Sequence, residues 1–217
     1  MRDGVGLASA TSPMMASPAN GDKAFTFGGA GGIFLAMGTP TLGSKLGTTT
    51  HLSPLLRKAR RFGLGAPELE RLAIERGCDY YGGGELTPLV LVSLEQFSNA
   101  ELAIALLNPA LRYDPQTVRL GAAMLSAEGN SPDQIARLAV MERCERVVRY
   151  IAEAGKKFEP NNLFWPHLLQ RLPSGAPPKS GVLPHPTRFV AMTGFTRRGP
   201  ETVVEWIRPT TAQPARG

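Results

Sequence analysis

Histidine and cysteine, the side chains that most often do chemistry, are few and scattered in this chain. Its three histidines, His51, His167 and His185, lack the spacing with which histidines bind a metal ion together. The two cysteines, Cys78 and Cys144, lie 66 positions apart and form neither a disulfide framework nor a zinc-binding pattern. No nucleophile elbow or zinc-protease motif occurs. We therefore expect no catalytic residue, no metal site and no cofactor.

The two thiols are predicted to differ in their surroundings. Cys144 lies in an apolar stripe with helical spacing, so we expect a small buried hydrophobic residue there. Cys78 lies between Gly77 and Asp79, which predicts an exposed loop. A neighbouring carboxylate raises the pKa of a thiol, so Cys78 is not predicted to be an activated nucleophile.

A glycine-rich segment near the N-terminus resembles the strand and phosphate-binding loop of nucleoside-triphosphate-binding proteins. An apolar run over residues 33–37 precedes Gly38 and Gly43. A phosphate loop needs a lysine followed by serine or threonine, so that the lysine reaches the phosphates and the hydroxyl holds Mg²⁺. Here Ser44 precedes Lys45, which reverses that order. We interpret the segment as a flexible loop and predict no nucleotide cofactor.

Residues 68–78 resemble the first helix and turn of the helix-turn-helix family of DNA-binding motifs. Ala73 stands where that family needs close helix packing, and Gly77 stands where it needs a left-handed turn. Three consecutive glycines, residues 82–84, follow where the second helix would begin, and each opposes a helix by about 1 kcal/mol. We therefore interpret the segment as an ordinary helical hairpin.

Basic residues are concentrated in one short run. The net charge of +6 is typical of proteins that bind nucleic acid. Residues 53–172, however, carry 15 basic and 14 acidic side chains, and four of the basic ones form the run Arg57, Lys58, Arg60 and Arg61. An electrostatic partner is therefore expected to meet this run or the C-terminal segment instead of a broad basic face.

Two further segments are candidates for recognition. Tyr80 and Tyr81 precede the glycines of residues 82–84, and tyrosines beside glycines suit an adaptable contact loop. Arg197 and Arg198 fall in a predicted turn near the C-terminus. The candidate interaction residues are Arg57, Lys58, Arg60, Arg61, Tyr80, Tyr81, Arg197 and Arg198.

Proline residues mark the starts of helices in the middle of the chain. Proline at the first helical position gives up an N–H that has no partner there, and Ser, Thr or Asp before it can cap the helix. The pairs are Ser53-Pro54, Ala66-Pro67, Thr87-Pro88, Asp114-Pro115 and Ser131-Pro132. The predicted fold class is mainly α: a compact bundle of six or seven short helices with a small C-terminal β-hairpin and a disordered N-terminal tail.

Residues 102–107 are all apolar, which predicts a helix at the centre of the bundle. Ser98 and Glu101 form a capping-box pattern before it, and Asn108-Pro109 ends it. Gly121 lies in the next predicted helix, residues 115–128, and would permit close packing of that helix against a neighbour. The apolar run over 88–97 fits a buried helix or a strand, and its periodicity does not decide between them.

The longest helix is predicted over residues 132–154. Ser131 and Gln134 form a capping-box pattern at its start, and Gly155 is predicted to end it. Oppositely charged pairs at i,i+4 spacing predict a solvated outer face: Glu142-Arg146, Glu145-Arg149 and Arg149-Glu153.

Composition divides the chain into a tail, a helical domain and a C-terminal part. The predicted boundaries are 1–50 for a disordered low-complexity tail, 51–172 for the helical domain, 173–186 for a Pro/Gly linker, 187–208 for a β-hairpin packed on the helical domain and 209–217 for a disordered tail. No stretch approaches the ~20 apolar residues of a membrane span. We therefore expect a soluble, cytoplasmic protein without a membrane partner.

The sequence favours a non-enzymatic helical protein that acts as a macromolecular interaction or adaptor module, with another protein as its partner. One alternative is a nucleic-acid-binding regulator that uses the basic run from Arg57 to Arg61. A second alternative is an enzyme whose site is assembled from residues far apart in the sequence.

Overall fold

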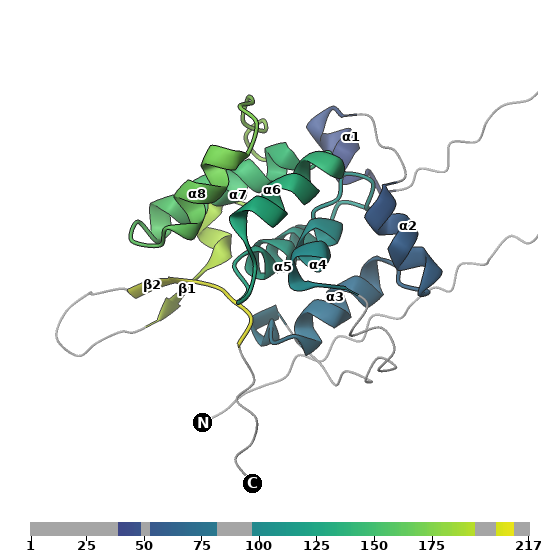
Figure 1. Cartoon of the computed structure of the whole chain (residues 1–217), viewed down its shortest axis with the longest axis horizontal. Coiled ribbons are helices and arrows are strands. Elements are labelled where there is room, and N and C mark those ends of the chain that lie inside the picture. The colour runs from purple at the N-terminus through teal and green to yellow at the C-terminus, as the bar shows by residue number, and fades with distance from the viewer. Residues whose placement is uncertain (1–38, 49–52, 82–96, 194–202, 211–217) are drawn as a thin grey trace, which may run out of the picture. The chain divides into compact units, whose positions relative to one another are not determined.

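The computed structural model describes residues 39–48, 53–81, 97–193 and 203–210 (Figure 1). Several predictions lie outside these ranges: the N-terminal tail up to residue 38, the glycines of residues 82–84, the helix start at Thr87-Pro88, the helix-or-strand segment 88–97 except Phe97, the turn with Arg197 and Arg198, and the C-terminal tail from residue 211.

The described chain is mainly α-helical with a small antiparallel hairpin near its C-terminal end, so the predicted fold class is confirmed. Its elements are α1 (Leu42–Leu46), α2 (Pro54–Arg61), α3 (Ala66–Glu75), η1 (Asp79–Tyr81), α4 (Asn99–Leu106), α5 (Pro115–Leu125), α6 (Pro132–Met141), α7 (Glu145–Phe158), α8 (Phe164–Arg171), η3 (Pro186–Phe189), β1 (Val190–Thr193) and β2 (Val203–Trp206). No helix in these ranges is long and apolar enough to cross a membrane.

Most of the predicted helix starts form as the residue types require. The hydroxyl of Ser53 accepts a hydrogen bond from the N–H of Leu56, and Ser98 and Glu101 form a capping box on α4. Asp114 caps α5 in the same way. The capping box predicted at Ser131 is wrong, because that side chain makes no cap hydrogen bond on α6.

Helix α4 lies at the centre of the bundle, as its composition predicted. It contacts α2, α3, α5 and α6, and every residue from Leu102 to Leu106 is buried. On α5, a Cβ built at Gly121 would lie 2.7 Å from the Leu107 side chain, so the absent side chain allows the two helices to pack closely.

The prediction of one long helix over 132–154 is wrong, because the helix is interrupted between α6 and α7 (Figure 1). Arg143 adopts a left-handed backbone with φ of 54°. The N–H of Cys144 then turns back to the carbonyl of Ala139, 2.9 Å away. The break rotates the side chains that follow relative to those that precede it, so the i,i+4 pattern across residue 143 has no meaning.

Gly155 does not end a helix, contrary to the prediction from sequence. It lies within α7 and faces Trp165 of α8, whose ring would lie 2.3 Å from a Cβ built at Gly155. Trp165 in turn packs on Trp206 of β2, with ring centroids 4.8 Å apart. This glycine therefore makes room for the aromatic contact between the helices and the hairpin.

Strands β1 and β2 pair in antiparallel register, with Val190 opposite Trp206 and Ala191 opposite Glu205. Past β2, the N–H of Thr210 donates to the carbonyl of Gly77 over 2.8 Å. Gly77 has φ of 100°, which confirms the predicted left-handed turn at the end of α3. The hairpin and its C-terminal extension thus connect to two different parts of the helical bundle.

The first described segment, residues 39–48, falls in the range assigned to a tail but packs with the helices. Leu42 of α1 is 2% exposed, and its N–H donates to the carbonyl of Leu111 over 2.9 Å. Ser44 and Lys45, the reversed pair of the phosphate-loop resemblance, belong to this helix. The packed helical part therefore begins before residue 51.

Candidate functional site

Helix α2 divides into an apolar side and a basic side. Leu55, Leu56 and Ala59 are buried against the bundle. Arg57, Arg60 and Arg61 are exposed. Positions three and four apart lie on one helix face, so the three arginines form a single surface. We call this surface the arginine face of α2.

Lys58 belongs to the predicted basic run but has a different environment. Its Nζ lies 2.7 Å from Oε1 of Glu101 on α4 and 4.8 Å from the centroid of the Phe97 ring. Burial alone would raise the pKa of Glu101, but hydrogen bonds from Lys58 and Ser98 outweigh it and lower that pKa. Lys58 is therefore engaged within the fold.

The side chains of the arginine face have no such engagement. Within the described ranges, no hydrogen bond or ion pair holds the side chain of Arg57, Arg60 or Arg61. Helix α2 contains no acidic residue. The residue after the helix, Phe62, is 38% exposed. The structure thus gathers three of the predicted basic residues into one surface and separates the fourth, Lys58, from it.

A buried carboxylate, Glu142, anchors the other end of α2. Glu142 is 1% exposed. Its Oε1 accepts the N–H of Leu55 over 3.0 Å, and its Oε2 accepts Nδ2 of Asn108 over 2.8 Å. Asn108 also donates to the hydroxyl of Ser53 over 2.9 Å. We call these groups the Glu142 network. The prediction that Glu142 lies on a solvated face is therefore wrong.

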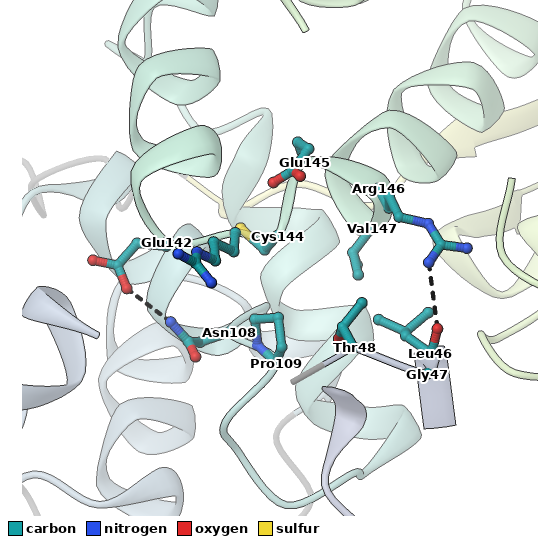
Figure 2. A pocket seen from close by; sticks show the side chains of 11 residues that line it. Leu46, Gly47, Thr48, Asn108, Pro109, Glu142, Cys144, Glu145, Arg146 and Val147 are labelled. Atoms are coloured by element: carbon teal, nitrogen blue, oxygen red, sulfur yellow. Dashed lines mark hydrogen bonds between the residues drawn. The ribbon is translucent and has the colours of Figure 1, made fainter. Parts of the chain in front are cut away.

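A cavity of about 450 Å³ lies beside the Glu142 network, at the turn between α6 and α7 (Figure 2). Its lining includes Thr48, Asn108, Glu142 and the first turn of α7. Figure 2 shows Glu142 directed toward Asn108, while Arg146 reaches away to the carbonyl of Leu46, 3.3 Å from its Nη1. Glu142, Asn108 and Arg146 thus make contacts that join α1, the residues after α4 and the α6–α7 turn.

Cys144 lines the same cavity and is fully buried, as predicted. Burial raises its pKa well above the ordinary value, and the neighbouring carboxylates of Glu145 and Glu142 raise it further. A thiol of this kind is a poor nucleophile. Among the described residues, no three His, Cys, Asp or Glu side chains gather as a metal site requires.

Cys78 was predicted in an exposed loop, and the structure corrects this. It is fully buried, with Sγ 3.5 Å from Sδ of Met124. Burial, with the charge of Asp79 as a smaller cause, raises the pKa of Cys78 to about 12. The direction predicted from Asp79 is therefore right, although the surroundings are not.

Tyr80 and Tyr81 point to different environments, so they do not form one contact surface. Tyr80 is 65% exposed, whereas Tyr81 is buried and its hydroxyl donates to the carbonyl of Arg188 over 3.4 Å. Burial raises the pKa of Tyr81. The two rings meet edge to face at 5.3 Å. Only Tyr80 remains available on the surface, and the glycines after it lie outside the described residues.

The helix-turn-helix resemblance ends at the turn after α3. The short η1 follows Gly77 in the place where a second helix would begin to form. A Cβ at Gly77 would lie 2.2 Å from the carbonyl oxygen of Thr210, so the C-terminal segment covers this turn.

The chain matches no protein-family model, no curated protein and no solved structure. Sequence reasoning found the arginine run but missed Glu142, because its local pattern is that of an exposed helix residue and only the tertiary fold brings it to Leu55.

Proposed function

We propose that this protein is a non-enzymatic binding module that engages an acidic macromolecule through the arginine face of α2. The observation that carries the proposal is the contrast within one basic run. Lys58 bonds to Glu101, whereas the exposed Arg57, Arg60 and Arg61 have no partner in the described parts of the chain.

The folded protein gains little from keeping these three charges together. Like charges at i,i+4 spacing, such as Arg57 and Arg61, destabilise a helix by roughly 0.2–0.5 kcal/mol per pair. The helix dipole favours Arg60 and Arg61 in the last turn but gives no such support to Arg57 one turn earlier. An anionic partner would relieve the repulsion and use all three guanidinium groups.

The test is binding of the full chain to two labelled polyanions, a DNA duplex and poly-glutamate, followed by fluorescence anisotropy. The informative variant is R57Q/R60Q/R61Q. The matched control is R112Q/R137Q/R188Q, which removes the same charge from three exposed arginines on separate segments. We expect binding at about 50 mM salt to at least one polyanion, and a loss of roughly tenfold or more only in the α2 variant.

Two results would contradict the proposal. One is the absence of binding to either polyanion at low salt. The other is an equal loss in both variants, because net charge alone would then explain the binding.

A further inference from the structure

The exposed side of α2 itself, residues 54–61, lacks the apolar centre that a protein interface uses. The apolar side chains of the helix, Leu55, Leu56 and Ala59, are all buried in the bundle. Phe62, the residue after the helix, is 38% exposed. Protein interfaces concentrate their energy in a few buried aromatic or apolar anchors, around which arginine is also enriched. The exposed side of α2 supplies three arginines, but its own apolar side chains are turned inward and give it no such anchor.

From this we infer that the acidic partner is a nucleic acid, held by its phosphate backbone without reading of the base sequence. The inference rests on the proposed function, since it names the partner of the same arginine face. Phosphate contacts need charge and directed N–H donors but no apolar centre.

The spacing of the arginines suits a phosphate chain. Along an α-helix, Arg57 and Arg61 are separated by about 6 Å, at about 1.5 Å per residue. Successive phosphates of one DNA strand rise by about 3.4 Å along the duplex, so this span covers roughly two steps. Each guanidinium can bind phosphate oxygens in a bidentate manner, which the ammonium of a lysine does not do.

The anchoring of α2 argues against reading of bases. Recognition helices of DNA-binding motifs place their N-terminal residues on base edges in the major groove. Here the start of α2 is tied to the protein interior, because the N–H of Leu55 donates to the buried Glu142. The arginines lie along the exposed side of the helix, from Arg57 near its middle to Arg61 at its end, where they can reach a backbone alongside it.

The experiment is a salt series with the full chain and a labelled duplex of random sequence, with poly-glutamate as the second probe. For three phosphates neutralised, the slope of log K against log salt should be about −2.7, so affinity falls roughly 40-fold between about 50 and 200 mM salt. R57Q/R60Q/R61Q should lose most of this slope, and R112Q/R137Q/R188Q should keep it. R57K/R60K/R61K should keep the slope and bind several-fold more weakly.

The outcomes separate this inference from the proposed function. Binding of poly-glutamate through the arginine face without binding of the duplex overturns the nucleic-acid inference and leaves the proposed function standing. Failure with both probes overturns both. A preference of more than roughly tenfold for one duplex sequence contradicts backbone binding, since sequence is read through base contacts. Far-UV circular dichroism of each variant checks that the helices are retained.

Discussion

The charged groups at the start of helix α2 and along its exposed side differ in how the fold engages them. At its start, the carboxylate of Glu142 is buried and both oxygens accept hydrogen bonds from within the protein. Along its exposed side, Arg57, Arg60 and Arg61 are solvated and, in the described ranges, have no partner inside the protein. Contacts within the fold therefore account for the charge of Glu142 but not for those of Arg57, Arg60 and Arg61. A charge that the fold does not use is the better candidate for a role in binding.

The largest effect on this comparison is expected from Glu142→Ala. The substitution leaves the N–H of Leu55 buried without an acceptor, and it removes one of the two acceptors of the Asn108 side-chain amide. Unsatisfied buried groups cost about 1–3 kcal/mol each, so the free energy of unfolding should fall by about 3 kcal/mol. Guanidinium denaturation of the variant measures this directly.

The matched variant for that experiment is R57Q/R60Q/R61Q. Exposed substitutions that break no contact change stability by less than about 0.5 kcal/mol. If Glu142→Ala and the arginine variant lower the free energy of unfolding equally, Glu142 and the arginine face do not differ in their contribution to the fold.

A smaller loss in the free energy of unfolding is expected from Lys58→Ala. This variant tests whether Lys58 stabilises the fold or acts as part of the arginine face. The Lys58–Glu101 pair is partly exposed, so its loss should cost at most about 1 kcal/mol at neutral pH. The pKa of Glu101 is lowered from its ordinary value of 4.5, so this stabilisation is complete above that value and is lost as pH falls through the lowered pKa.

The stability difference between the wild type and Lys58→Ala should therefore be present at neutral pH and shrink in acid. Thermal unfolding followed across this pH range checks the prediction. A difference that stays constant into acid would show that Lys58 does not act through Glu101. The same variant should leave binding to polyanions nearly unchanged.

The smallest effect is expected from Arg143→Gly, at the turn that carries Glu142 into the interior. Arg143 has φ of 54°, a conformation that glycine adopts without strain. Relief of strain outweighs the greater flexibility of glycine in the unfolded chain, so the free energy of unfolding should rise by about 0.5 kcal/mol. Urea denaturation measures it, and a loss of stability would mean that the Arg143 side chain has a structural role.

Features that depend on neighbouring residues in the sequence were predictable. Ser53, Ser98 and Asp114 cap their helices because each side chain needs only the first turn that follows it. The centrality of α4 followed from its uniform apolar composition. The left-handed turn at Gly77 followed from residue type.

Features set by tertiary contacts were not predictable in this way. In the sequence, apolar residues keep helical spacing across residue 143, so periodicity alone gave one long helix; in the structure, Val140 and Met141 before the break are exposed. A glycine at position 155 is typical of a helix end. In the structure, however, the Trp165 ring packs where a side chain at this position would lie. Cys78 lies beside a glycine and an aspartate, yet the fold buries it against Met124.

The same division holds for the candidate site. The run from Arg57 to Arg61 was visible as charge density, and helical spacing places three of its members on one face. That Lys58 turns to Glu101 depends on where α4 lies, which no local pattern indicates. Tyr81 was likewise grouped with Tyr80 by sequence and separated by burial.

The central claim is that the arginine face of α2 is the surface that binds. Arginine Nε–Hε resonances, followed by NMR in the full chain as a DNA duplex is added, test it most directly. We predict that the signals of Arg57, Arg60 and Arg61 shift together, while those of Arg137 and Arg188 stay in place. Shifts confined to arginines outside α2, with the three α2 signals unchanged, would contradict the account.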